Sequence, residues 1–238
     1  MSNVRIIVIV PAFNEAATIT SVVYQCRVVM PEAAILVVDD CSTDDTARLA
    51  QDAGAIVISL PNNLGIGGAV QTGYLFAHRN NYDIAIQVDG DGQHDPVHLV
   101  DLVNTMWERN ADLVIGSRFL DRNGYQSTLA RRVGIRIFSG LLRLLYNVRV
   151  TDITSGFRAA NKRTIKFFAQ QYPYDFPEVE SVARLIELGG IVSEIPVSMR
   201  ARAGGHSSIS SWKTIYYMVR VFVGIIVNWK PKKRIGDG

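Results

Sequence analysis

The fold is decided by the run Val4-Arg5-Ile6-Ile7-Val8-Ile9-Val10, which leads directly into Pro11-Ala12-Phe13-Asn14-Glu15. β-Branched residues dominate the run, and this pattern is typical of a strand that is buried on both faces. A helical pattern of apolar residues follows near residues 15–30. A doubly buried strand followed by a helix predicts a βαβ unit, in which the chain returns to form a parallel neighbour.

The same alternation continues through the first half of the chain. Further short apolar runs occupy residues 34–38, 55–60, 84–88 and 113–115, and helical patterns occupy residues 44–53, 67–80 and 95–109. Repeated strand–helix units predict an α/β fold with a mostly parallel, Rossmann-like sheet flanked by helices. Ligands of such sheets bind beyond the carboxyl ends of the strands, so we expect functional residues in the loops that follow the strands.

Length and composition narrow the class of protein. A chain of 238 residues is within the range of one large α/β domain, and a hydrophobic content of 48% excludes a disordered chain. The formal net charge of +3 is too small to indicate a nucleic-acid partner. Two cysteines are too few for a disulfide framework, and the N-terminal residues lack the features of a signal peptide. We therefore expect a reducing, cytoplasmic location.

The most informative loop is Asp89-Gly90-Asp91, which directly follows the apolar run at residues 84–88. Two carboxylates separated by a glycine place hard oxygen ligands on a tight turn, and such ligands suit Mg²⁺ or Mn²⁺. Mg²⁺ usually keeps several waters and binds substrate phosphates in addition to one or two protein carboxylates. An Asp-Gly turn with solvated carboxylates is the alternative interpretation.

Two more acidic residues, Asp39 and Asp40, follow the apolar run at residues 34–38. A carboxylate at a strand end can accept hydrogen bonds from ribose hydroxyls or from a base, so we expect both residues to contact a nucleotide. The residues that follow, from Ser42 to Asp44, also suit the start of a helix. Glu15 has two interpretations as well, which are nucleotide contact and a favourable interaction with the dipole of the following helix.

These loops and two later segments form a recognisable set: Pro11-Ala12-Phe13-Asn14-Glu15, Val37-Val38-Asp39-Asp40-Cys41-Ser42-Thr43-Asp44, Asn63-Leu64-Gly65, Asp89-Gly90-Asp91-Gly92-Gln93-His94, Gly116-Ser117-Arg118 and Asp152-Ile153-Thr154-Ser155-Gly156-Phe157-Arg158. In order and spacing the first four resemble the family 2 inverting glycosyltransferases of GT-A fold. The last two are similar to the branch that makes polyprenyl-phosphate or dolichyl-phosphate sugars. The resemblance extends over roughly residues 4–205.

The resemblance implies a role for each matching residue. The first two loops would bind a nucleotide-sugar donor through Pro11, Ala12, Asn14, Glu15 and Asp40, with Asp39 beside them. The metal on the donor diphosphate would be bound by Asp89 and Asp91, with Gln93 adjacent. The acceptor phosphate would be bound by Arg118 and Arg131. A basic, glycine-rich loop would bring Arg202 to the donor or acceptor phosphates.

The type of acceptor decides whether a general base is needed. A sugar hydroxyl must lose a proton to a positioned Asp or Glu. A phosphate monoester has a second pKa of about 6 and is already largely a dianion at neutral pH, so it needs cations rather than a base. A helical pattern at residues 128–149 carries a stripe of arginines, which favours polyprenyl phosphate as the acceptor.

Two other hypotheses remain open. Transfer to a hydroxyl of a saccharide or lipid-linked sugar would use Glu178 as the base, although a first-turn acid after Pro177 is also an ordinary partner of a helix dipole. A protein that binds nucleotide sugars without turnover is the third hypothesis. The presence of Asp89, Asp91 and Arg202 disfavours it.

An apolar stretch from Thr214 to Trp229 lies beyond these motifs. It is shorter than the roughly 20 residues of a membrane-spanning helix, and a basic segment from Lys230 to Arg234 follows it. We expect a catalytic domain at residues 1–210 and a C-terminal amphipathic, interfacial helix with a basic tail at residues 211–238. This helix would hold the enzyme on the inner face of the cell membrane. Packing against the core, a second copy of the chain or a membrane protein is the alternative.

Overall fold

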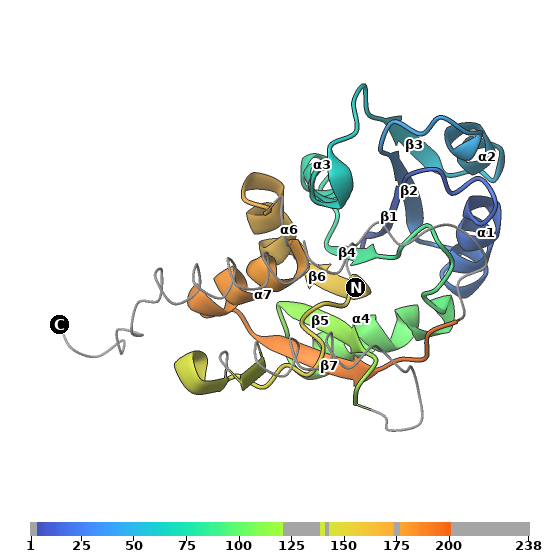
Figure 1. Cartoon of the computed structure of the whole chain (residues 1–238). Helices are drawn as coiled ribbons and strands as arrows, with labels where there is room; N and C mark the ends of the chain where they lie inside the picture. Colours follow the sequence, from blue (N-terminus) through green and yellow to red (C-terminus); the bar gives the residue numbers. More distant parts are fainter. Residues whose placement is uncertain (1–3, 121–138, 141–142, 174–176, 201–238) are drawn as a thin grey trace.

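A computed structural model describes residues 4–120, 139–140, 143–173 and 177–200 (Figure 1). Arg131, Arg202 and the predicted C-terminal helix therefore lie outside the described residues. Within the described ranges, no helix is long and apolar enough to cross a membrane.

The described residues contain a seven-stranded sheet in the order β3-β2-β1-β4-β6-β5-β7. The strands are β1 (Ile6–Ala12), β2 (Ala34–Asp39), β3 (Ile56–Ser59), β4 (Ile84–Gln87), β5 (Leu113–Ser117), β6 (Arg158–Asn161) and β7 (Val192–Pro196). Strand β6 is antiparallel to both of its neighbours, β4 and β5, while the other pairs are parallel. The predicted mostly parallel sheet is confirmed, and β1 to β5 correspond to the five predicted strands.

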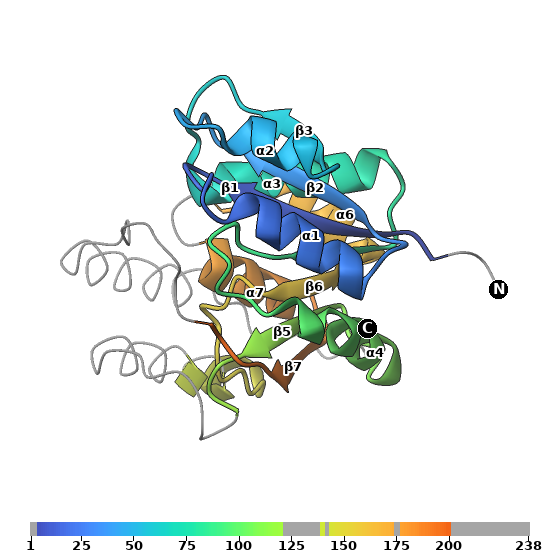
Figure 2. The ribbon, with the colours of Figure 1, turned by 90° about the vertical axis from the view of Figure 1, so that its right-hand side faces the viewer.

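Helices cover both faces of the sheet (Figures 1 and 2). They are α1 (Ile19–Val29), α2 (Thr46–Asp52), α3 (Gly65–Arg79), α4 (Leu99–Glu108), α6 (Lys162–Gln170) and α7 (Pro177–Glu187), with a short 3-10 helix η1 (Pro96–His98) before α4. One apolar core joins the sheet to α3, α6 and α7, and a second joins it to α1, α2 and α4. The architecture is thus a three-layer α/β sandwich.

Strand β1 lies at the centre of both cores. Ile7 and Ile9 pack in the core on the α3 side, whereas Val8 and Val10 pack in the core on the α1 side. All four side chains are 0% exposed. Successive side chains of a strand point to opposite faces, so only a continuous apolar run satisfies both layers. This confirms the prediction made from residues 4–10.

Helix α1 begins later than its sequence pattern indicates, at Ile19 rather than near residue 15. Asn14 has a φ of 56°, a left-handed conformation that a right-handed helix does not accept. The main-chain carbonyl of Glu15 then accepts hydrogen bonds from the N–H groups of Thr18 and Ile19. Residues 13–18 therefore form a loop at the end of β1 instead of the first turn of a helix.

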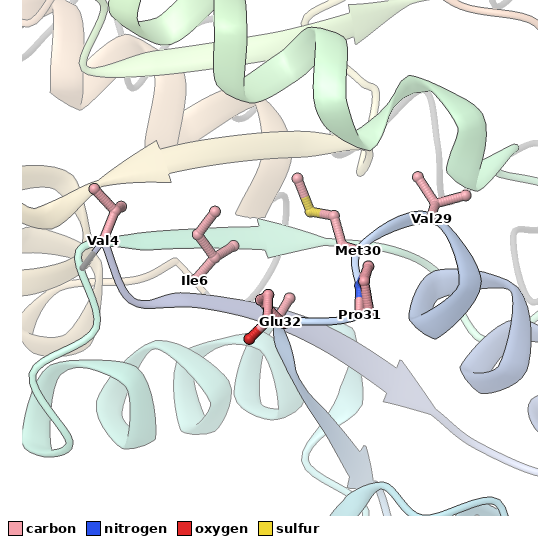
Figure 3. Close-up of a pocket in the computed structure, with 7 residues that line it drawn as sticks. Val4, Ile6, Val29, Met30, Pro31 and Glu32 are labelled. Atoms are coloured by element: carbon pink, nitrogen blue, oxygen red, sulfur yellow. The ribbon is translucent and has the colours of Figure 1, made fainter.

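A cavity of about 240 Å³ lies between the start of β1 and the connection from α1 to β2 (Figure 3). Its lining is mainly apolar and includes Ile6, Val29 and Met30. Because it adjoins the amino ends of β1 and β2, it lies at the opposite edge of the sheet from the polar loops described below.

Candidate active site

The loops that follow β1, β2 and β4 meet at one edge of the sheet. The N–H of Asp40 donates to the carbonyl of Ala12 at 2.9 Å, and the N–H of Gly90 donates to the carbonyl of Pro11 at 3.3 Å. The end of β1 therefore lies between the Asp39-Asp40 pair and the Asp89-Gly90-Asp91 turn. Strand order reverses between β1 and β4, and such a switch point is where open α/β sheets bind ligands. The predicted gathering of these loops is confirmed.

The first two loops are joined by several hydrogen bonds. The N–H of Asn14 donates to Ser42 Oγ at 2.9 Å, and the N–H of Thr43 donates to Asn14 Oδ1 at 2.8 Å. The N–H of Ala16 donates to Asp44 Oδ2 at 3.1 Å. The predicted donor-binding residue Asn14 thus uses its amide oxygen to brace the neighbouring loop.

Asp39 and Asp40 are 4% and 3% exposed. Asp39 Oδ1 accepts from the N–H of Ser42 at 3.2 Å, and Asp40 Oδ1 accepts from the N–H of Leu64 at 2.7 Å. Each carboxylate therefore fixes the conformation of a loop at this edge, and Asp40 brings in the third loop, which precedes α3. Burial of two carboxylates is tolerated because backbone donors satisfy them.

The Asp89-Gly90-Asp91 turn differs in exposure along its length. The side chain of Asp89 is 36% exposed, whereas Asp91 is 9% exposed. Asp91 Oδ1 accepts from the N–H of Gln93 at 3.0 Å, and the carbonyl of Gly90 accepts from Thr18 Oγ1 at 2.7 Å. These bonds hold the turn against the β1 loop.

This pair of carboxylates fits a hard divalent cation. Among the described residues no group of three His, Cys, Asp or Glu side chains could hold a metal ion. Mg²⁺ needs only one or two carboxylates because water and substrate phosphates complete its coordination.

Two residues beside Asp89 were not assigned a role from the sequence, although both lie within its motifs. The N–H of Asp89 donates to His94 Nδ1 at 3.0 Å, and His94 Nε2 lies 3.6 Å from Asp89 Oδ2. A Cβ atom at Gly156 would lie 3.1 and 3.2 Å from the two carboxylate oxygens of Asp89 and 3.0 Å from Gln87 Nε2. Gly156 therefore permits a close approach that only a residue without a side chain allows.

We predict that Gly156→Ala displaces the Asp89 carboxylate by a few tenths of an ångström. The sugar transfer that the resemblance to glycosyltransferases implies should then fall about tenfold, as for a group that supports a metal ligand. Gly156→Val should lower it further because its side chain is larger. Transfer rates and melting temperatures of both variants check this. Unchanged transfer by a folded Gly156→Val variant would contradict the close approach.

Arg118 lies in a buried ion pair with Asp152. Arg118 Nε donates to Asp152 Oδ2 at 2.6 Å, Arg118 Nη2 donates to Asp152 Oδ1 at 2.7 Å, and the two side chains are 6% and 0% exposed. β5 and the segment before β6 bring these two residues together.

Glu194 on β7 binds the main chain next to this ion pair. Its carboxylate accepts from the N–H groups of Thr151 and Asp152 at 2.7 and 2.8 Å. Burial raises the pKa of Glu194 above its usual value, and these hydrogen bonds oppose that rise. The segment that carries Asp152 is thus fixed to the sheet through its main chain.

Arg158 is fully buried and connects two parts of this edge. It donates to the carbonyl of Ser155 at 3.1 Å through Nε, and through Nη1 to the carbonyl of Glu178 at 3.3 Å and to Ser181 Oγ at 3.1 Å. Glu178 lies in the first turn of α7, which begins at Pro177, as the sequence indicates. The guanidinium of Arg158 therefore links the main chain of Glu178, the candidate base, to Ser155, which precedes Gly156.

A mixed sheet of this order, with carboxylate loops beyond its central strands, is consistent with the GT-A fold that the sequence motifs imply. The chain belongs to glycosyl transferase family 2, whose model matches residues 7–167, and it is a glycosyltransferase.

The similarity to known proteins extends beyond the family match. An undecaprenyl-phosphate mannosyltransferase of Micrococcus luteus is 31% identical over 216 residues, which cover 87% of this chain and 88% of the relative. A polyprenol monophosphomannose synthase of Mycolicibacterium smegmatis is 29% identical, with coverage of 87% and 81%.

One solved structure of similar fold is glucosyl-3-phosphoglycerate synthase of Mycobacterium tuberculosis, in complex with Mn²⁺, UDP and glucosyl-3-phosphoglycerate. It has a TM-score of 0.69 at 21% identity, and the match covers 100% of this chain and 84% of that one. This similarity confirms the predicted GT-A fold.

Proposed function

We propose that this glycosyltransferase moves one sugar from a nucleoside-diphosphate sugar to a polyprenyl phosphate, with inversion, at the inner face of the cell membrane. The main support is that two relatives, each matched over 87% of this chain, are named as an undecaprenyl-phosphate mannosyltransferase and a polyprenol monophosphomannose synthase. The carboxylate loops at the switch point of the sheet are consistent with a nucleoside diphosphate held through a cation.

The donor site consists of the loops after β1, β2 and β4. Pro11, Ala12, Asn14 and Glu15 line the nucleotide side together with Asp39 and Asp40. Asp89 and Asp91, with Gln93 beside them, hold Mg²⁺ or Mn²⁺, which when bound offsets the charge of the departing diphosphate. The acidic edge formed by these loops favours a divalent cation over a second anion.

The proposed reaction is a single displacement at the anomeric carbon. An oxygen of the acceptor phosphate forms a bond to that carbon from the face opposite the diphosphate. The bond from the carbon to the diphosphate oxygen breaks, and its electron pair leaves with the nucleoside diphosphate. No proton is exchanged when the acceptor is already a dianion, so this chain needs to orient the acceptor and exclude water rather than to supply a base.

In this proposal Arg118 binds the acceptor phosphate, and Arg131 and Arg202, which lie outside the described residues, are further phosphate ligands. The segment at residues 128–149 contributes basic residues to the acceptor side. The described part of that segment presents Arg143 and Leu144 to solvent, and Leu144 is 81% exposed. A basic residue beside an exposed apolar one suits a surface of anionic lipid headgroups and acyl chains. The apolar stretch from Thr214 to Trp229 supplies further membrane contact in this proposal.

Transfer to a sugar hydroxyl is the second candidate function. It is favoured by the contact that Arg158 makes with the main chain of Glu178, because this contact links the candidate base to the segment beside Asp89.

A transfer assay with labelled GDP and UDP sugars, in liposomes with and without undecaprenyl phosphate, tests the function. We expect label in the lipid only when undecaprenyl phosphate is present, and we expect Glu178→Gln to keep at least about a third of the rate because a phosphate acceptor needs no base. Loss of nearly all transfer in a folded Glu178→Gln variant would favour a hydroxyl acceptor. Binding of a nucleotide sugar without transfer to any acceptor would favour a non-catalytic protein.

A further inference from the structure

His94 is buried next to the metal-binding turn, although its polar ring would be solvated more easily at the surface. It is 4% exposed, and its ring stacks on Phe157 with a centroid distance of 4.9 Å and an interplanar angle of 15°. Phe157 covers one face of the ring, and the side chain has almost no contact with solvent. His94 is therefore placed to act through a neighbouring residue.

Both nitrogens of the ring face Asp89. Nδ1 accepts from the N–H of Asp89 at 3.0 Å, so in the neutral ring the proton is on Nε2. Nε2 lies 3.6 Å from Asp89 Oδ2, which is longer than a hydrogen bond but leaves its N–H dipole near the carboxylate. One imidazole therefore contacts the main chain and faces the carboxylate of the same residue.

The surroundings leave the His94 ring little freedom. His94 forms an isolated antiparallel bridge with Met199, and the N–H of Arg200 donates to the carbonyl of Gln93 at 2.9 Å. Arg200 Nη2 also donates to Asp95 Oδ1 at 2.8 Å. The segment on which His94 lies is thus held by Met199 and Arg200.

From this geometry we propose that His94 is a positioning residue for Asp89, which holds the Asp89 main chain through Nδ1 and limits the directions of its carboxylate. The proposal rests on the proposed function, in which Asp89 binds the cation. Groups that orient a metal ligand typically contribute 10-fold to 100-fold to metal affinity. His94 would contribute to Mn²⁺ affinity without touching the ion.

Three variants separate the hydrogen bond from packing. The amide oxygen of His94→Asn occupies the same place in the side chain as Nδ1, one atom beyond Cγ, and can accept from the N–H of Asp89. The amide of His94→Gln lies one bond further, near Nε2, and leaves that N–H without its acceptor. His94→Phe keeps the stacking on Phe157 but has no acceptor. A merely structural role would rank these variants by packing rather than by the position of the acceptor.

In the experiment, Mn²⁺ is titrated into each protein, alone and with UDP or GDP. The free ion is measured by its electron paramagnetic resonance signal. We expect His94→Asn to bind Mn²⁺ within about threefold of the unmodified protein, and His94→Gln and His94→Phe to bind it about 10-fold to 100-fold more weakly. Melting temperatures measured on the same samples report folding. If His94→Phe does not fold, the comparison of His94→Asn with His94→Gln still decides.

Equal Mn²⁺ affinity in His94→Gln and the unmodified protein would overturn the role of His94 and leave the metal site standing. Equal losses in His94→Asn and His94→Gln would also overturn it, because the acceptor position would then have no effect. Absence of Mn²⁺ binding by the unmodified protein with either nucleotide would overturn the metal assignment, and the role of His94 with it.

Discussion

Replacing Asp91 by asparagine is expected to lower sugar transfer about a thousandfold, which corresponds to about 4 kcal/mol of transition-state stabilisation. The amide oxygen introduced by Asp91→Asn can still accept from the N–H of Gln93, a bond that Asp91 Oδ1 makes at 3.0 Å. The turn should therefore keep its conformation, and the change removes mainly the negative charge that we propose holds the cation. Initial transfer rates over a range of Mn²⁺ concentrations measure the effect.

A matched control for this substitution is Asp101→Asn. Asp101 carries the same charge in the first turn of α4, and its side chain is 63% exposed beside His98. Its removal should change transfer less than twofold, since exposed charges outside the site contribute little. Full transfer by Asp91→Asn in the presence of EDTA would refute the metal assignment.

The fold was predictable wherever apolar periodicity was strong. The run at residues 4–10 predicted the central strand because both faces of β1 are covered, so no polar residue interrupts it. Strands β6 and β7 were missed for the opposite reason. The sequence of β6, Arg-Ala-Ala-Asn, has no apolar run, and that of β7, Val-Ser-Glu-Ile-Pro, is only partly buried. Both are strands because the edges of β4 and β5 supply hydrogen-bonding partners.

The candidate site was predictable where a motif follows its own strand. The end of β1 lies between the ends of β2 and β4 because parallel strands align their carboxyl ends. Contacts between distant segments gave no such pattern. Gly156 meets Asp89 across 67 positions of the chain, and Asp152 meets Arg118 across 34. Residue types alone do not show which arginine a buried aspartate will bind.

The second large effect is expected from breaking the buried ion pair of Asp152 and Arg118. Asp152→Asn is expected to lower the free energy of unfolding by about 3–5 kcal/mol, because it removes the buried negative charge that the guanidinium of Arg118 contacts through two nitrogens. In a chain of this size, such a loss lowers the melting temperature by about 10 °C. Urea unfolding and calorimetry measure both quantities. The same variant should weaken acceptor binding if Arg118 meets the acceptor phosphate, since the pair fixes the direction of the guanidinium.

The exposed ion pair of Asp83 and Lys162 provides the control. Its atoms are 2.8 Å apart, but the side chain of Lys162 is 62% exposed, so Asp83→Asn should cost less than about 1 kcal/mol. The hydrogen bond from Lys162 lowers the pKa of Asp83, so its contribution is present at neutral pH and is lost only as the pH falls through that lowered pKa. Both variants are therefore compared at pH 7. Equal losses in the two would mean that Arg118 has another counter-charge, and that the Asp152 pair does not anchor this side of the site.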